Sequence, residues 1–195
     1  MIKILAIDPA IRNLGLARMQ FDPGTSQLTV VDIMLVTTES ESGKTVRKNS
    51  DDLRRARLLQ DAIKYYSKDM DIVMAEVPVG TQSARGAMSN GICIGLIAAI
   101  NKPIIEVTPS EAKMASIGRK TASKEEIIDW AFRVNPDLDW KIRWSKGVKR
   151  LTHANEHMAD AIAIGHAGIK TSEFKNAVAM VNAISGINML PRNGV

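Results

Sequence analysis

The sequence predicts an α/β fold with five strands, and three features of the chain lead to that prediction. The chain opens with a short apolar run, residues 2–7, which ends on Asp8 and Pro9. Two further strand-like segments follow at once and form a meander with it. Beyond residue 50, helical and strand-like segments alternate before the chain ends in helices.

The first strand carries the first candidate functional residue. A continuous apolar run of this length, bounded by a turn signal, indicates a strand that is buried on both faces. Asp8 would then lie at the carboxyl end of a central strand, half inside the core, where an unpaired charge is costly. A cation or a charged partner would offset that cost. The alternative is that Asp8 only opens a turn with Pro9.

The meander continues through residues 16–21 and 27–36, which are separated by the strong turn signal at residues 22–24. Residues 37–50 are polar and are predicted to form a mobile basic loop. A helix is then expected to begin at Asp51, because apolar residues recur with an approximate period of 3.6. Its other side is expected to be a solvated face, with a DNA contact as the alternative. The cations on that side are Arg54, Arg55 and Arg57.

The fourth predicted strand, residues 71–77, again carries one acid, Glu76, at its exit. Two strands that each end on a buried carboxylate indicate a shared site more strongly than one does. A helix is predicted over residues 81–100 and a fifth strand over 104–107. Each glycine in that helix lowers helix propensity by about 1 kcal/mol. We therefore expect close packing on the sheet or an interface between two copies of the chain.

A short helix is predicted over residues 109–118, and Ser123 is expected to cap another helix that runs to about residue 134. Residues 135–151 show no clear period and carry several cations among Trp140 and Trp144. Aromatic rings among cations can stack on nucleic-acid bases. The alternative is a surface loop whose tryptophans pack on the core.

The third acidic element is a predicted helix over residues 153–168. His157 and Asp160 are three residues apart and share a face that differs from the apolar stripe. The alternative is an ordinary solvated polar face, and His166 is interpreted as structural. A last helix is expected over 171–185, followed by a frayed tail that includes Pro191.

Composition is that of an ordinary globular protein with 45% hydrophobic residues, a net charge of +5 and a pI near 9.4. The basic balance makes an anionic partner plausible. Cys93 is the only cysteine, so a disulfide framework is excluded and a reducing compartment fits. Residues 91–100 form the longest strongly apolar stretch and are too short to span a bilayer. These features predict a cytoplasmic protein without a membrane partner.

The order of elements and acids resembles the ribonuclease H-like superfamily, and more closely the RuvC-type Holliday-junction resolvases. The resemblance covers most of residues 1–168 in the same order. It implies a mixed sheet of three antiparallel meander strands plus two parallel strands, flanked by helices. It also implies one nuclease domain over residues 1–170, with residues 171–195 as its C-terminal helix and tail. The matching segments are ILAIDPAIRNLG (4–15), MAEVP (74–78), PSEAKMASIGRKTASKEEI (109–127) and HMADAIAIGHA (157–167).

The resemblance implies an endonuclease that nicks Holliday junctions or other branched DNA and leaves 5′ phosphates. Two Mg²⁺ ions about 3.5–4 Å apart, which Mn²⁺ can replace, would clamp the scissile phosphate. A homodimer would match the two-fold symmetry of a junction. The implied metal ligands are Asp8, Glu76, His157 and Asp160. Lys113 is implied near the scissile phosphate and Lys124 on DNA, and the basic segments add Arg119, Lys120, Lys146, Lys149 and Arg150 as predicted DNA contacts.

The chain departs from the family pattern at three places. Ala10 stands where glycine is usual, residues 77–79 lack the usual aromatic, and the basic segment 137–151 is longer. These departures indicate a divergent, phage-type member with a looser choice of branched DNA, in a bacterial cell or a phage-infected host. Flap or fork cleavage and non-catalytic junction binding remain alternatives. An actin-like phosphotransferase would need a glycine-rich phosphate loop and usually a duplicated domain, which 195 residues do not supply.

Overall fold

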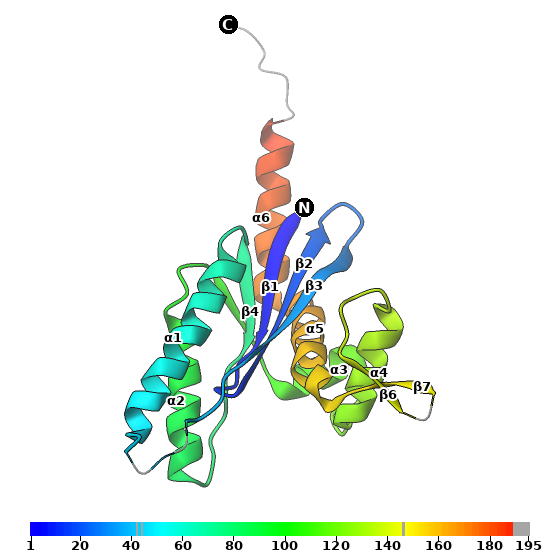
Figure 1. The fold of residues 1–195 in the computed structure, drawn as a ribbon. Helices are drawn as coiled ribbons and strands as arrows, with labels where there is room; N and C mark the ends of the chain where they lie inside the picture. Colours follow the sequence, from blue (N-terminus) through cyan, green and yellow to red (C-terminus); the bar gives the residue numbers. More distant parts are fainter. Residues whose placement is uncertain (42, 44, 146, 189–195) are drawn as a thin grey trace, which may run out of the picture.

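The computed structural model (Figure 1) describes residues 1–41, 43, 45–145 and 147–188, and a mixed five-stranded sheet forms its centre. The spatial order is β3-β2-β1-β4-β5. The pairs β1–β2 and β2–β3 are antiparallel, whereas β1–β4 and β4–β5 are parallel. The predicted fold class is therefore confirmed. The strands are β1 (Ile2–Asp8), β2 (Asn13–Asp22), β3 (Gln27–Thr37), β4 (Ile72–Glu76) and β5 (Ile104–Val107).

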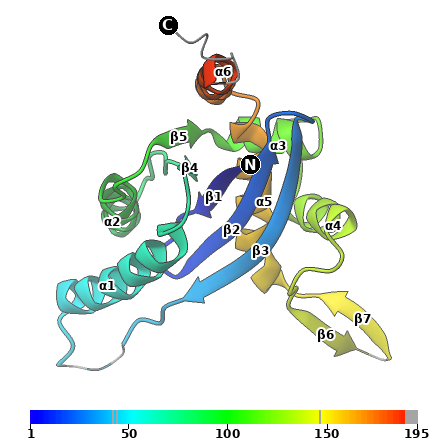
Figure 2. The same ribbon diagram turned by 90° about the horizontal axis from the view of Figure 1, so that it is seen from above.

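Helices cover both faces of this sheet. Figure 2 shows α1 and α2 on one side and α3, α4 and α5 on the other. A 3-10 turn, His153–Asn155, leads directly into α5. The helices are α1 (Lys48–Ser67), α2 (Ala84–Ala98), α3 (Pro109–Ser116), α4 (Lys124–Val134), α5 (Glu156–Gly168) and α6 (Ser172–Asn188).

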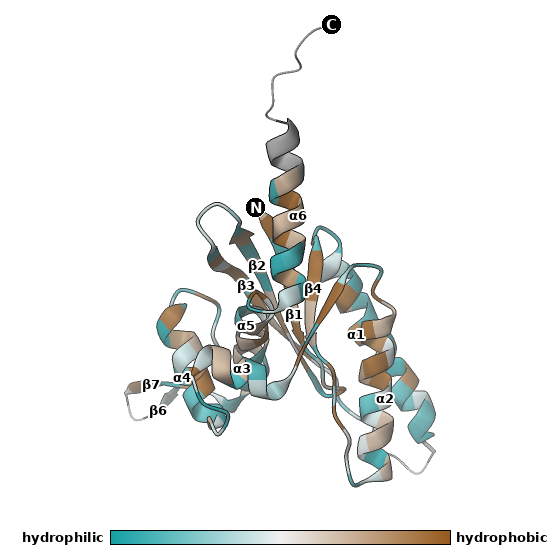
Figure 3. Cartoon of the chain, turned by 180° about the vertical axis from the view of Figure 1, so that it is seen from behind, coloured by the Kyte–Doolittle hydropathy of each residue, from teal (hydrophilic) through white to brown (hydrophobic). Residues whose placement is uncertain are grey.

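The central strand β1 is buried on both faces, as its unbroken apolar run predicts. Successive side chains of a strand point to opposite sides of the sheet. Ile4 and Ala6 belong to the apolar cluster that includes α5, whereas Leu5 and Ile7 belong to the cluster that includes α1 and α2. All four side chains are fully buried. In Figure 3 the neighbouring strand β4 is likewise coloured as hydrophobic along most of its length.

Strand register brings the two strand-end acids to one edge of the sheet. The parallel pair β1–β4 matches Ile7 with Ala75, so Asp8 and Glu76 each follow the last matched pair. On the other side of β1, Asp8 is paired with Gly15 of β2. The carboxyl ends of the two central parallel strands therefore place both acids together.

Helix α5 lies unusually close to the sheet at three glycines. A methyl group on Gly15 would come within 1.9 Å of the His157 carbonyl oxygen. Methyl groups on Gly165 and Gly168 would each come within 2.2 Å of a methionine sulfur, that of Met19 and that of Met74 respectively. At Gly15 the clash is with backbone, so space requires glycine there; at Gly165 and Gly168 an added methyl group would have to displace the end of a buried methionine side chain.

Helix α1 differs from its predicted form. It begins at Lys48, before the predicted start, and the predicted solvated face is wrong for Arg55, which is only 5% exposed. Arg55 donates a hydrogen bond to Thr38 Oγ1 at 2.9 Å and lies 3.9 Å from a carboxylate oxygen of Asp52. Asp52 also accepts hydrogen bonds from both terminal nitrogens of Arg85 on α2. This buried ionic network satisfies charges that the periodicity assigned to solvent.

Residues 135–151 are not a simple loop. They contain a two-stranded antiparallel hairpin made of β6 (Ile142–Ser145) and β7 (Val148–Leu151). Gly147 in its turn has φ 76°, a conformation that favours glycine. The two tryptophans of the segment separate: Trp140 is buried, whereas Trp144 is 66% exposed.

The glycines of α2 do not all pack closely. A methyl group on Gly91 or Gly95 would meet nothing within 4 Å, so close packing on the sheet does not account for these two positions. The predicted interface between copies stays a prediction.

The last described helix, α6, packs on the sheet through one aromatic residue. Its Phe174 is buried edge-on against Phe21, with ring centroids 4.9 Å apart. The helix runs three residues past its predicted end, and the predicted frayed segment around Pro191 lies outside the described residues. Within the described part of the chain, no helix combines the length and apolarity that crossing a membrane requires.

Replacing Gly15 with alanine should push the start of α5 away from β2, because the added methyl group has no space. We expect the free energy of unfolding to fall by about 1–3 kcal/mol, measured by urea denaturation. Gly91→Ala is the matched control, and should leave stability unchanged or raise it by up to about 1 kcal/mol. Equal stabilities for the two variants would contradict the close approach at Gly15.

Candidate active site

The contact between Asp8 and His157 defines the candidate site. A carboxylate oxygen of Asp8 lies 2.6 Å from His157 Nδ1, although the residues are 149 positions apart in sequence. Their side chains are only 15% and 22% exposed. Burial opposes protonation of His157, but the hydrogen bond and the charge of Asp8 outweigh it and raise the pKa of the imidazole. Asp8 is thus partnered, as its position at the end of a central strand requires.

Glu76 and Asp160 form the rest of an acidic cluster around Asp8. Burial and then the charge of Asp8 raise the pKa of Glu76 to about 7, while Lys113 opposes the shift. Burial and the same charge raise the pKa of Asp160 to about 7, with smaller contributions from Glu156 and Glu76. Each acid therefore holds its proton more strongly because negative charge has gathered in a partly buried place.

Two predicted cations border this cluster from different helices. Lys113 comes from α3, and its charge acts on Glu76. Lys124, the first residue of α4, forms an ion pair with Glu156, and its charge also acts on Asp160 and Asp8. The capping box that starts α4, Ser123 with Glu126, is present as predicted. The cap fixes where α4 begins and hence where Lys124 lies.

The other predicted DNA contacts that the structure describes, Arg119, Lys120 and Arg150, lie outside the acidic cluster. Arg119 is partly engaged in an ion pair with Glu126, and Lys120 is exposed. Arg150 lies on β7, in the wall of a cavity of about 560 Å³ between the hairpin and α4. Lys146 lies outside the described residues, and for Lys149 only the backbone, within β7, is described.

The donor set suits a hard divalent cation, because carboxylate oxygens with one imidazole are ligands that Mg²⁺ and Mn²⁺ accept. The mutual repulsion of Asp8, Glu76 and Asp160 is a second feature that a cation would relieve. Among the described residues, however, no three His, Cys, Asp or Glu side chains are grouped closely enough to hold an ion as they stand. The contact between Asp8 and His157 occupies donor atoms that a metal would need.

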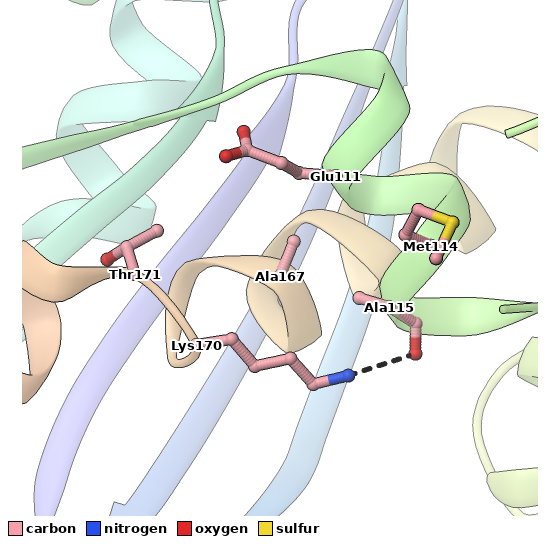
Figure 4. A pocket seen from close by; sticks show the side chains of 6 residues that line it. All are labelled: Glu111, Met114, Ala115, Ala167, Lys170 and Thr171. Atoms are coloured by element: carbon pink, nitrogen blue, oxygen red, sulfur yellow. Dashed lines mark hydrogen bonds between the residues drawn. The ribbon is translucent and has the colours of Figure 1, made fainter. Parts of the chain in front are cut away.

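A separate cavity of about 340 Å³ lies at the opposite end of α5 (Figure 4). Ala167 lines it, ten residues beyond His157, which is about 15 Å along a helix. Lys170 closes one side by donating a hydrogen bond to the Ala115 carbonyl oxygen at 3.5 Å. Its mainly apolar wall and its distance from the acids separate it from the candidate site.

Sequence reasoning missed Asn155, which is fully buried immediately before α5. Its side chain accepts a hydrogen bond from the Lys141 amide at 2.8 Å and donates one to the Lys141 carbonyl at 2.9 Å. It therefore ties the base of the β6–β7 hairpin to the helix that carries His157 and Asp160. A lone asparagine in a polar run gives no sequence signal of this role.

Comparison with known proteins gives matches at the level of structure alone. No family model and no curated protein matches the sequence. Thermus thermophilus RuvC superposes with a TM-score of 0.56 at 20% identity, covering 91% of this chain and 97% of that one. The same protein in complex with a Holliday-junction substrate gives 0.56 at 18% identity, covering 85% and 92%. Fowlpox virus resolvase with its junction DNA gives 0.51 at 16% identity, covering 90% and 99%.

These matches confirm the predicted ribonuclease H-like fold in the form found in RuvC and the poxvirus resolvase. The matched regions span nearly the whole of those chains and about nine-tenths of this one, so the likeness extends well beyond the central sheet.

The raised pKa values predict how stability responds to pH. Between about pH 5 and 7 the folded chain keeps protons on Glu76 and Asp160 that the unfolded chain has released. Folding stability should therefore fall as the pH rises through this window. Urea denaturation in a metal chelator at pH 5 and pH 7.5 measures the change.

Glu76→Gln should lose less stability than the wild type between these two pH values, because one of the two shifted carboxyls is gone. Glu106→Gln, a substitution of an exposed acid on the adjacent strand β5, is the matched control and should behave as the wild type does. An identical pH dependence in all three proteins would contradict the shift at Glu76.

Proposed function

We propose that the protein is a structure-selective endonuclease that nicks four-way DNA junctions with the help of Mg²⁺. The observation that supports this most strongly is the convergence of Asp8, Glu76, His157 and Asp160 within a RuvC-like fold. These residues come from two parallel strand ends and one helix. A cluster that raises the pKa of its own acids is costly to fold, and binding of cations and DNA would offset that cost.

We assign Asp8, Glu76, Asp160 and His157 as the residues that would hold the cations. When bound, such cations activate water and stabilise the leaving oxygen, which would give a 5′ phosphate product. His157 would have to release Asp8, and the carboxylates would have to draw closer together. Mn²⁺ should replace Mg²⁺, since the donors are the same.

The lysines have distinct parts in this proposal. Lys113, whose charge already acts on Glu76, would offset the extra negative charge that develops on the phosphate. Lys124, paired with Glu156, would hold a DNA phosphate beside the site. A homodimer would carry two such sites across a two-fold axis, matching the symmetry of a junction.

Cleavage of flaps or forks is the second candidate function, because substrate choice depends on loops and dimer geometry rather than on the acidic cluster. The exposed hairpin with its cations would bind phosphates of any of these branched forms. Comparing cleavage of four-way, three-way and flap DNA by one enzyme preparation separates these functions.

Asp8→Asn and Glu76→Gln should each abolish Mg²⁺-dependent nicking of a synthetic four-way junction while leaving junction binding largely intact. Nicking is measured on labelled strands, and binding by gel shift in a chelator. Asp61→Asn, which alters an exposed acid on α1, is the matched control and should retain wild-type activity. Full activity in Asp8→Asn would contradict the assignment of Asp8 as a metal ligand.

Replacing Lys146, Lys149 and Arg150 together by alanine should reduce the salt dependence of DNA binding. For every phosphate that the protein no longer neutralises, the slope of log K against log salt becomes shallower by roughly 0.9. The control triple variant replaces three exposed cations at the other end of the strands from the acidic cluster. These are Lys3 at the start of β1 and Lys64 and Lys68 around the end of α1. If both triple variants kept the wild-type slope, the hairpin cations would lie off the DNA interface.

A further inference from the structure

Like α6, the β6–β7 hairpin stands away from the layered body of the protein (Figures 1 and 2). Figure 2 shows it projecting beyond α4 and the start of α5. An isolated two-stranded hairpin is marginally stable in water. This one is fixed at its base by Asn155, whose two hydrogen bonds to Lys141 are joined by a third from the Thr152 amide to the same carbonyl at 3.1 Å. The structure thus holds a projecting element firmly at its root.

Trp144 is the exposed tryptophan of this chain. All three tryptophans lie in the described residues: Trp130 and Trp140 are 9% and 5% exposed, and Trp144 is 66% exposed. Trp140 donates from its indole nitrogen to the Asn135 carbonyl at 2.8 Å and contacts Phe132 edge-on. The interpretation that tryptophans pack on the core therefore holds for Trp140 and fails for Trp144. A large apolar ring exposed on a projecting strand indicates a binding surface.

The charges around Trp144 favour a polyanion. Residues 140–151 contain no aspartate or glutamate. In the hairpin register, Arg143 is paired directly with Arg150. Like charges opposite each other in an antiparallel pair destabilise it, and bound phosphates would remove that cost. The neighbouring pair in the same register sets Trp144 opposite Lys149.

We propose that the hairpin is a recognition element for branched DNA, in which Trp144 on one face stacks on a base exposed at the branch point and Arg143 and Arg150 on the opposite face bind phosphates. This proposal rests on the proposed function, and it identifies the part of the DNA substrate that the hairpin binds. Aromatic rings among cations bind unpaired bases because every base offers a stacking face while the cations neutralise its backbone. Asn155 connects the hairpin to the candidate active site, because it binds the base of the hairpin and lies two residues before His157.

A second copy of the chain fits this surface less well. A symmetric interface places the same patch on both sides, so the hairpin's cations would face their own copies without acids of the hairpin to balance them. Ile142, which shares the face of Trp144, is 42% exposed and would be covered equally well by a base or a sugar.

The test measures affinity for a four-way junction and for a linear duplex, with the full chain in a chelator so that no cleavage occurs. Trp144→Ala should weaken junction binding roughly tenfold or more, the loss of one stacked base. It should change duplex binding by no more than about twofold, because a continuous duplex has no branch point at which a base is exposed. Trp144→Phe should keep most of the junction affinity. Tyr65→Ala, which removes a 74% exposed aromatic on α1, is the matched control and should bind as the wild type does.

A fluorescent base analogue, 2-aminopurine at the branch point, gives a second readout. Its emission should change on binding of the wild type and of Trp144→Phe, and change much less with Trp144→Ala. Equal junction affinity and equal emission for the wild type and Trp144→Ala would overturn the proposal. A shift of Trp144→Ala from dimer to monomer in sedimentation, with unchanged DNA affinity per protomer, would instead assign the hairpin to an interface between copies and would also overturn it.

Failure of the proposed function is distinguishable from failure of this inference. If the wild type nicks no branched DNA with Mg²⁺ or Mn²⁺ but Trp144→Ala loses junction affinity, the chain is a junction-binding protein that uses this hairpin. If nicking occurs and Trp144→Ala binds normally, the nuclease assignment stands and the hairpin assignment falls.

Discussion

The approach of α5 to the sheet is the contact on which the candidate site depends. Its first turn lies against β2 at Gly15, where no side chain would fit beside the His157 carbonyl. Further along, Gly165 and Gly168 receive the sulfur atoms of Met19 and Met74. Because these contacts fix the helix at both ends, they also fix the depth and rotation at which His157 and Asp160 reach β1. Small residues far from any chemistry thus set the geometry of the acidic cluster.

The acidic cluster works against the stability of the fold that presents it. Glu76 and Asp160 are partly buried, and the charge of Asp8 acts on both. The apolar clusters on the two faces of the sheet supply the stabilisation that offsets this repulsion, since burial of apolar surface is the main favourable term in folding. The contact of Asp8 with His157 relieves part of the repulsion.

The sequence was informative where a pattern is local and continuous. The unbroken apolar run before Asp8 indicated a central strand, and the same pattern before Glu76 indicated its neighbour; together they placed both acids at one edge. Ser123 with Glu126 indicated where α4 begins. These features depend on neighbours within a few positions, so they can be read from the chain itself.

Other features depend on partners that are distant in the chain. Arg55 looked solvent-facing because periodicity does not show that Thr38 accepts its hydrogen bond. The hairpin could not be predicted because strands of four residues are too short to show alternation among cations. The contact of Lys124 with Glu156 links two helices and has no local sign. For His157 and Asp160, helical spacing showed a shared face, but only the family resemblance indicated what that face meets.

The span of chain between Asp8 and His157 has a consequence for synthesis. A chain leaving the ribosome carries Asp8 and Glu76 before α5 has been made, so the strand-end acids are at first without their helix partners. The cluster is completed only when about 160 residues have emerged and α5 has docked on the finished sheet. A product that stops before α5 therefore lacks the assembled acidic cluster.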